Sequence, residues 1–303
     1  MATPLWARLD SRHLVTLSEV ARCGSFTAAA TSLGYTQSAV SQQIARLERI
    51  VGHALVDRLP GGRSVSLTPA GRVVLQHADV VAATVQRAAA DIAALDQGMA
   101  GTLRIGCFES VGTGLLPDAL AIFYETFDRV QVVLSELPDD GDLLDRLGRD
   151  ELDLSFVVYP LAPGPFESAA LLEDPYVLLV AEDSPMATVT GAVDLDDYPE
   201  LPLVGYGEMR AVHSIEARLG RPSYGSRIVF RSNQNSTIVS LVQRGHVAAV
   251  LPRLSVVPLP PGLRTVELRR VSPRVVGLAW HRHRPVSEAA AGFIRAVEEV
   301  VEA

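Results

Sequence analysis

The N-terminal part of the chain is patterned as a series of short amphipathic helices. Apolar side chains recur every three or four positions over residues 11–22, and Gly24 follows as a residue that ends helices. An alanine-rich helix predicted over residues 26–33 is closed in the same way by Gly34. A third helix, capped by a threonine, is predicted over residues 36–50, and its buried stripe is Val40, Ile44, Leu47 and Val51.

The face of this third helix opposite its apolar stripe is polar, cationic or small and contains no acidic residue. Two helices joined by a short turn, the second polar near its N-terminus, form the helix-turn-helix unit that enters the DNA major groove. Glutamine pairs with adenine and arginine with guanine, while serine and threonine bind phosphates or base edges. The alternative is an ordinary three-helix domain with a solvated polar face. The residues of this face are Gln37, Ser38, Ser41, Gln42, Ala45, Arg46 and Arg49.

A small hairpin is predicted after the three helices. Residues 55–58 and 63–67 flank a Pro-Gly-Gly turn, which places Arg58 and Arg63 near the tip. Such a wing can reach DNA phosphates.

Thr68 and Pro69 then begin a long helix, with the hydroxyl as cap and the proline at the first helical position. Apolar residues repeat along it at spacings of four and three, which suits packing against a second helix and favours a dimer. A helix buried against its own protein is the alternative. The repeating positions are Val74, Ala78, Val81, Val85, Ala88, Ile92 and Leu95.

Strand-like and helix-like segments alternate through the rest of the chain. This alternation predicts α/β architecture with a parallel sheet flanked by helices. Strands are expected at residues 102–107, 130–136, 152–158, 176–181, 201–205, 227–231, 247–251 and 275–281. Helices are expected at residues 115–127, 140–149, 212–219, 236–244 and 286–301.

Two proline-rich segments, residues 160–165 and 258–262, interrupt this alternation and suggest two lobes. In such folds a ligand binds beyond the carboxyl ends of the strands, often in a cleft between lobes. The first lobe is expected to hold about residues 101–160 and 264–303, and the second about residues 165–263. The whole chain then divides into a winged helix-turn-helix over residues 1–68, a linker and dimerisation helix over 69–95, and a two-lobed domain over 96–303.

Charge is distributed unevenly along the chain. The 303 residues include 35 acidic and 27 basic ones, giving a net charge of −8, and every basic residue is arginine. Residues 1–75 hold eight arginines and four acids, a charge of +4, so the remainder carries −12. The acidic average therefore does not oppose DNA binding by the N-terminal part. The absence of lysine excludes Schiff-base chemistry, a phosphate-binding loop ending in Gly-Lys and a protein-kinase core.

Other chemistries have little support in the sequence. The two cysteines, Cys23 and Cys107, form no disulfide framework, and residues 1–17 fit neither a signal peptide nor a membrane span, so a cytoplasmic protein is expected. A redox role for Cys107 is the minority alternative to a buried structural cysteine. Because His281 and His283 lack a third ligand nearby and no nucleophile elbow occurs, we expect no metal, no cofactor and no enzyme activity.

The N-terminal motifs resemble one family closely. They occur in the order seen in the winged helix-turn-helix of LysR-type transcriptional regulators, and the resemblance covers residues 10–95. Ser38 stands where the family commonly has proline and Gln42 where arginine is frequent, which leaves the operator sequence open. The motifs are the run Gly24 to Ala30, the run Leu33 to Ile44, Leu47-Glu48, Asp57-Arg58 and Leu67-Thr68-Pro69-Ala70-Gly71.

The layout of the C-terminal part resembles the effector domain of the same family, which is similar to periplasmic solute-binding proteins. The resemblance implies a regulator that binds double-stranded DNA with two half-sites as a homodimer or homotetramer, with RNA polymerase as a further partner and no membrane. A solute-binding protein and a two-lobed enzyme are the alternatives. The DNA contacts are expected at Ser25, Thr27, Thr36, Gln37, Ser38, Ser41, Gln42, Arg46, Arg58 and Arg63.

A small-molecule effector is expected between the lobes. Helix N-termini and hydroxyl or amide side chains near the strand ends favour an organic acid. Glu109 would repel a carboxylate but could hold an amine or an amino acid, and a Glu109 that points to solvent is the third alternative. The resemblance places the effector against Glu109, Ser110, Val111, Tyr159, Tyr206, Ser232, Asn233 and Gln234.

Overall fold

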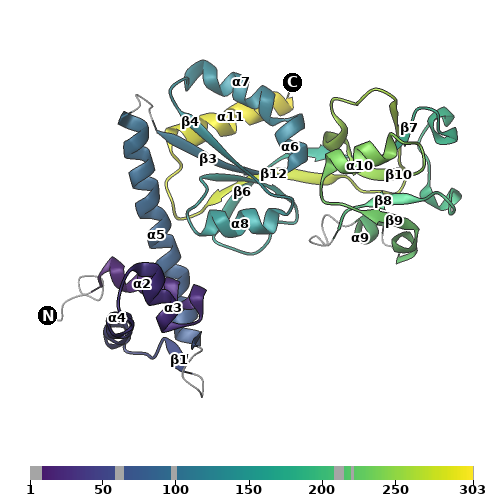
Figure 1. Cartoon of the computed structure of the whole chain (residues 1–303). Helices are drawn as coiled ribbons and strands as arrows, with labels where there is room; N and C mark the ends of the chain where they lie inside the picture. The colour runs from purple at the N-terminus through teal and green to yellow at the C-terminus, as the bar shows by residue number, and fades with distance from the viewer. Residues whose placement is uncertain (1–8, 59–64, 97–100, 208–214, 220–221, 303) are drawn as a thin grey trace. The chain divides into compact units, whose positions relative to one another are not determined.

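The computed structural model describes residues 9–58, 65–96, 101–207, 215–219 and 222–302 (Figure 1). The chain divides into two compact units, Met1–Asp91 and Ile92–Ala303. Each unit has a hydrophobic core of its own. In the part of the chain that is described, no helix is both long enough and apolar enough to cross a membrane.

Three short helices, a hairpin and the start of a long helix build the first unit, as the sequence predicts. The helices are capped by side chains at their starts, and Gly24, Gly34 and Gly52 end them in the left-handed conformation that glycine adopts without strain. The elements are α2 (Ser11–Cys23), α3 (Phe26–Leu33), α4 (Gln37–Val51), the antiparallel strands β1 (Val56–Arg58) and β2 (Val65–Leu67), and α5 (Pro69–Asp96).

The core of this unit lies between the three short helices and the beginning of α5. Its buried side chains include Leu17, Phe26 and Ile44, and Ala78 of α5 joins them. Gly71 allows α5 to approach the hairpin closely, because a Cβ at this position would lie 2.0 Å from the Leu55 carbonyl oxygen.

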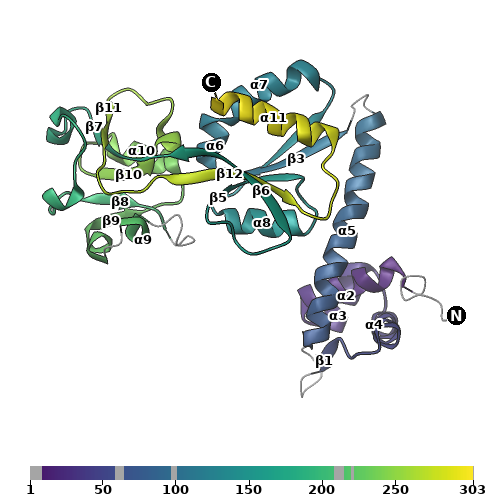
Figure 2. The same ribbon diagram turned by 180° about the vertical axis from the view of Figure 1, so that it is seen from behind.

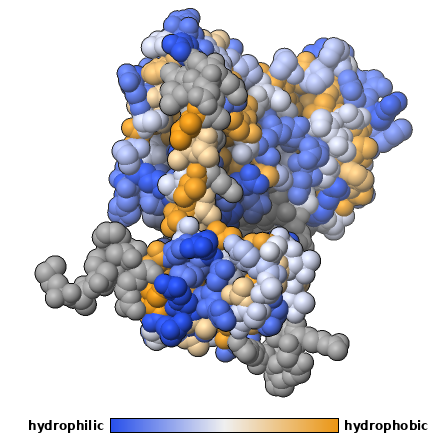
Figure 3. Space-filling view, turned by 60° about the vertical axis from the view of Figure 1, so that its left-hand side comes forward, coloured by the Kyte–Doolittle hydropathy of each residue, from blue (hydrophilic) through white to orange (hydrophobic). Residues whose placement is uncertain are grey.

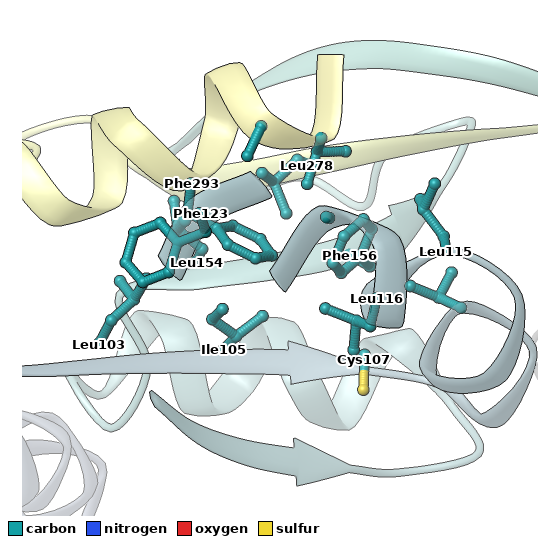
Figure 4. Close-up of a cluster of buried hydrophobic side chains, with 14 of the residues drawn as sticks. Leu103, Ile105, Cys107, Leu115, Leu116, Phe123, Leu154, Phe156, Leu278 and Phe293 are labelled. Carbon is teal, nitrogen blue, oxygen red and sulfur yellow. The ribbon is translucent and has the colours of Figure 1, made fainter. Parts of the chain in front are cut away.

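The first lobe of the second unit is a mixed sheet with helices on both faces. α7 (Leu116–Thr126) and α11 (Glu288–Glu302) cover one face, and α8 (Asp140–Gly148) covers the other (Figure 1). The side chains under α7 and α11 form the core shown in Figure 4. The strands lie in the order β4 (Gln131–Glu136), β3 (Thr102–Cys107), β5 (Leu154–Val158), β12 (Arg274–His281) and β6 (Phe166–Asp174).

The second lobe is built around another mixed sheet, seen from behind in Figure 2. α10 (Asn235–Val242) packs on one face. The short helices η1 (Pro185–Thr188), η2 (Leu195–Asp197), α9 (Ile215–Leu219) and η4 (Pro222–Arg227) contribute side chains to the core on the other face. The strands lie in the order β11 (Leu263–Glu267), β7 (Tyr176–Ala181), β10 (Ala248–Pro252), β8 (Leu203–Gly205) and β9 (Ile228–Arg231).

The lobe boundaries expected from the proline-rich segments are wrong. Residues 166–174 form β6 of the first sheet, and residues 263–267 form β11 of the second. The chain therefore crosses between the lobes at Pro175 and again between β11 and β12. Each proline-rich segment is a loop inside a single lobe, the first in lobe one and the second in lobe two. Proline marks a loop, but it does not determine which sheet the next strand joins.

The sheets are also mixed rather than wholly parallel. β3, β4 and β5 are parallel, as are β8, β9 and β10. The strands that flank the crossings run against their neighbours: β12 is antiparallel to β5 and β6, and β7 is antiparallel to β10 and β11. A short helix not expected from the sequence, α6 (Glu109–Gly114), follows β3 directly. Residues 212–214 of the expected helix 212–219 lie outside the described residues.

Candidate functional site

α4 presents an exposed polar face with a buried opposite side. Val40, Ile44 and Leu47 are buried in the core of the first unit. The Thr36 hydroxyl accepts a hydrogen bond from the backbone N–H of Ala39 at 3.2 Å, which fixes the first turn of the helix. Of the residues assigned to the DNA-facing side, Gln37, Ser38, Gln42, Arg46 and Arg49 are exposed and Ser41 is half-buried.

Polar contacts on the inner side hold α4 in place. The Glu48 carboxylate accepts hydrogen bonds from the backbone N–H groups of Leu55 at 2.8 Å and Val56 at 3.4 Å, which joins α4 to the start of the hairpin. The Thr16 hydroxyl of α2 donates to the side chain of Gln43. The exposed side chains therefore project from a helix whose position is fixed by its neighbours.

The remaining residues assigned to DNA contact differ in their surroundings. Thr27 and Thr36 are exposed, whereas the Ser25 hydroxyl caps α3 by accepting from the Ala28 N–H at 3.4 Å. Arg58 belongs to β1, and its side chain and the whole of Arg63 lie outside the described residues. Tyr35, which sequence reasoning did not single out, is 45% exposed in the turn that leads into α4.

The apolar repeat of α5 serves two different surfaces. Ala78 is buried in the core of the first unit and Val74 packs against that core, so these two positions are not free for a partner. The later positions are exposed, with Val85 at 61% and Ile92 at 62%. Val81 and Ala88 are exposed as well, and the side chain of Leu95 is outside the described residues. Hydrophobic side chains form a column along this helix (Figure 3).

A small cavity lies between the two lobes of the second unit. Its volume is about 40 Å³, room for a few water molecules but far less than the several hundred Å³ of a typical ligand pocket. A larger pocket of about 550 Å³ adjoins it and shares Pro138 and Asn233 of its lining. The residues that line the small cavity are Phe108, Glu109, Ser110, Pro138, Tyr176, Tyr206, Asn233, Asn235, Pro252 and Arg274.

Glu109 spans this cleft from the first lobe to the second. Its carboxylate accepts hydrogen bonds from the backbone N–H groups of Asn235 at 2.7 Å and Ser236 at 3.2 Å, in the first turn of α10. The side chain therefore does not point to solvent. It lies at a helix N-terminus, where a carboxylate is favoured.

The next residue, Ser110, belongs to a buried network. Arg274 donates to the Ser110 hydroxyl at 2.7 Å and forms an ion pair with Asp174, whose other oxygen accepts from the Leu254 N–H at 3.0 Å. The guanidinium also lies over the Phe108 ring, 5.1 Å from its centre. Sequence reasoning missed this arginine and this aspartate, because no local pattern connects residues a hundred positions apart.

The cavity gathers only part of the residues assigned to the effector. Glu109, Ser110, Tyr206 and Asn233 line it. The Tyr206 hydroxyl donates to the Asn235 side chain at 2.7 Å, and burial raises the pKa of Tyr206 to about 12. The Asn233 side chain accepts from the Gly207 N–H at 2.7 Å.

Four assigned residues do not line the cavity. Val111 is buried in the core of the first lobe, and the Tyr159 hydroxyl is bonded to Ser168 of β6 at 2.7 Å. The Ser232 hydroxyl accepts from the backbone N–H of Gln234, whose side chain is exposed. A position after a strand end does not determine the direction in which the side chain points.

Cys107 is a core residue, and His281 and His283 lie next to each other. Cys107 is 1% exposed in the core of Figure 4, and burial, with a smaller contribution from Glu136, raises its pKa to about 12. The rings of His281 and His283 meet edge to face, 5.9 Å apart. No group of three metal-ligating side chains occurs among the residues that the structure places.

The family of the chain follows from comparison with known proteins. Residues 11–72 match the bacterial regulatory helix-turn-helix proteins of the lysR family, and residues 96–302 match the LysR substrate binding domain. The probable HTH-type transcriptional regulator LrrA of Synechococcus elongatus is 31% identical, over 89% of this chain and 90% of that protein. The HTH-type regulator YfeR of Shigella flexneri is 27% identical, over 92% of this chain and 90% of its own length.

Solved structures of full-length regulators share the fold. CbnR, solved with its target DNA, matches with a TM-score of 0.68 at 19% identity, over 96% of this chain and all of that one. A variant of OxyR from Pseudomonas aeruginosa matches with a TM-score of 0.64 at 20% identity, over 95% of this chain and 97% of that one. The chain is therefore a transcriptional regulator of the LysR family, with a DNA-binding helix-turn-helix and an effector-binding domain.

Proposed function

We propose that α4 is the helix with which this regulator reads its operator. The observation that carries the proposal is the exposed, acid-free face of α4, which presents amide, hydroxyl and guanidinium groups while its other side is fixed in the core. Gln42 and Arg46 are four positions apart, so they project from one side of the helix. Both side chains are of the kinds that read bases in the major groove.

Phosphate contacts in this proposal come from other groups of the same unit. Thr27, Thr36, Gln37 and Ser38 are exposed and can donate to phosphate oxygens. Ser25 and Ser41 complete the surface at its edge, and Arg58 and Arg63 are assigned to the wing from their sequence positions. Since the chain has no lysine, its cationic phosphate contacts all fall to arginine, which binds phosphate with two parallel hydrogen bonds.

The proposed regulator acts as a dimer that reads two half-sites. The exposed apolar positions Val81, Val85, Ala88 and Ile92 of α5 offer a surface for the same helix of a second copy. Two-fold symmetry would then place two α4 helices on half-sites separated by about one DNA turn or a multiple of it. We also propose that two dimers assemble into a homotetramer and that the regulator contacts RNA polymerase. A regulator acts in the compartment of its DNA, so we place it in the cytoplasm.

The effector site of the proposal is the cleft between the lobes. A small organic acid or an amino acid or amine would bind there and shift the balance between closed and open lobes. The cavity of about 40 Å³ is too small for such a molecule, so binding inside it requires its lining to rearrange, whereas the adjoining pocket of about 550 Å³ offers room already. The change in lobe arrangement would then alter how the paired helices sit on DNA.

A gel-shift assay with the promoter region of the protein's own gene tests the DNA part. Gln42→Ala and Arg46→Ala should each weaken binding by about tenfold or more, the effect of losing a good base contact. Gln131→Ala and Arg295→Ala remove the same side-chain types from exposed positions of the effector domain and should leave binding unchanged. Unchanged binding in both α4 variants would refute the assignment of α4.

A further inference from the structure

Glu109 connects the two lobes by a contact that has the chemistry of a bound ligand. We propose that the Glu109 carboxylate is an internal latch, which holds the cleft closed at the N-terminus of α10 until an oxyanion effector takes its place. This inference rests on the proposed effector site and adds the chemical class of the effector and the group that it must displace.

The latch joins elements from opposite sides of the cleft. Glu109 is the first residue of α6, which follows a strand of the first lobe, whereas Asn235 and Ser236 begin α10 in the second lobe. Each carboxylate oxygen of Glu109 accepts one backbone N–H, from Asn235 at 2.7 Å and from Ser236 at 3.2 Å. This contact bridges 126 positions of the sequence and depends on the lobes being close together.

No side chain of its own segment caps α10 in place of Glu109. The residue at the N-cap position is Gln234, whose side chain forms no cap hydrogen bond. The first N–H groups of a helix have no partner within the helix and must find one elsewhere. Glu109 therefore supplies, from the other lobe, the hydrogen-bond acceptor that these N–H groups would otherwise find in water or in a ligand.

The place occupied by the carboxylate borders the cavity described above. Asn235 is buried and its side chain accepts from the Tyr206 hydroxyl, so the first turn of α10 is held in position. Arg274 provides a cation on the same cavity wall, and Ser110 a hydroxyl. An effector carboxylate in place of Glu109 would meet the same two backbone N–H groups, which stabilise its charge at the helix start.

The latch is also linked to the crossing between the lobes. Glu109 and Ser110 are consecutive residues at the start of α6, and the Ser110 hydroxyl accepts from Arg274 at the beginning of β12. Arg274 is paired in turn with Asp174 at the end of β6. A movement of the α6 start on release of Glu109 would therefore reach the point where the chain passes from one lobe to the other.

The negative charge of Glu109 determines which effectors can open the latch. With Glu109 in place, a free carboxylate at the cleft meets a like charge and an occupied helix start, so binding requires displacement. An anion that succeeds replaces one carboxylate by another and keeps the N–H groups of α10 satisfied. The lobes then lose the hydrogen bonds that Glu109 made between them, and the effector itself determines how they are held.

Hydrogen exchange of the full-length protein tests the latch without DNA. In Glu109→Ala, exchange of the segment that contains Asn235 and Ser236 should be about tenfold faster or more, the loss expected when charged hydrogen bonds are removed. Sodium acetate fits the space left by the deleted side chain and should slow the exchange of the variant back toward the wild-type rate. Glu125→Ala, which removes an exposed glutamate of α7, should exchange as the wild type does with and without acetate.

Two further measurements separate the latch from loss of structure and from an amine site. The thermal unfolding of Glu109→Ala must remain cooperative, and Glu109→Gln, which retains a neutral acceptor, should exchange at an intermediate rate. Unchanged protection in the alanine variant, or no slowing by acetate, would overturn the latch. If methylammonium chloride slows exchange in the wild type and acetate has no effect on the alanine variant, the cleft binds an amine and the oxyanion proposal is wrong. Operator binding is measured in a separate experiment, so a negative result for the latch would not affect the proposed role of α4.

Discussion

The Arg274 guanidinium lies 2.7 Å from the Asp174 carboxylate at the point where the chain crosses between the lobes. Asp174 ends β6, the last strand before the chain leaves the first lobe, and Arg274 begins β12, the strand that returns. Both side chains are buried, at 5% and 1% exposure. The ion pair thus ties together the two chain segments that connect the lobes.

We expect Asp174→Asn to destabilise the effector domain by about 3 kcal/mol or more. The substitution leaves a buried guanidinium without its counter-charge, and breaking a buried pair from one side is costly. Urea denaturation of the full-length protein measures the effect. The matched control is Glu182→Gln, which removes the partner of Arg264 in a pair that is 58% and 55% exposed and should cost less than about 1 kcal/mol. Equal losses in the two variants would contradict a special role for the buried pair.

Cys107 should be chemically inert in the folded protein. Its thiol is buried and its raised pKa of about 12 leaves almost no thiolate at neutral pH. In a Cys23→Ser background, iodoacetamide should label Cys107 only after denaturation, and hydrogen peroxide should not change operator binding. Labelling of the native protein at the rate of a free thiol would show that the thiol is accessible and would reopen a redox role.

Val85→Asp should shift the protein from dimer toward monomer. Val85 is exposed in the middle of the apolar positions of α5, and a carboxylate there would lose its hydration against a second helix. Light scattering coupled to size-exclusion chromatography gives the mass of the species in solution. Gln76→Asp places the same charge on an exposed position off the repeat and should leave the mass unchanged. A Val85→Asp protein with the wild-type dimer mass would remove α5 as the dimer contact.

Local signals explain why the N-terminal unit could be predicted from its sequence. The caps Ser25 and Thr36 and the glycines Gly24 and Gly34 act on their immediate neighbours, and the apolar spacing of α4 identifies its buried side. The wing also follows from local turn residues. The apolar pattern of α5 did not show that Ala78 packs on its own unit, since burial depends on residues distant in the sequence.

In the effector domain, local sequence signals did not determine the pairing of strands or the contacts of the site. The strands themselves were visible as apolar runs, but β6 and β11 were missed and their sheets were misassigned, because the partner of a strand is set by long-range pairing. Glu109 was singled out from its place after β3, yet its actual partners, the N–H groups of Asn235 and Ser236, are more than a hundred positions away. Arg274 gave no local signal at all.

If the exposed face of α4 reads the operator, the ratio of specific to non-specific DNA affinity depends on its side chains. Fluorescence anisotropy at one fixed salt concentration gives the Kd of Gln42→Ala and of the wild type for the operator and for an unrelated duplex. Since base contacts specify and phosphate contacts position, the variant should lose about tenfold or more on the operator and almost nothing on the unrelated duplex. An equal loss on both duplexes, or none on either, would contradict the claim.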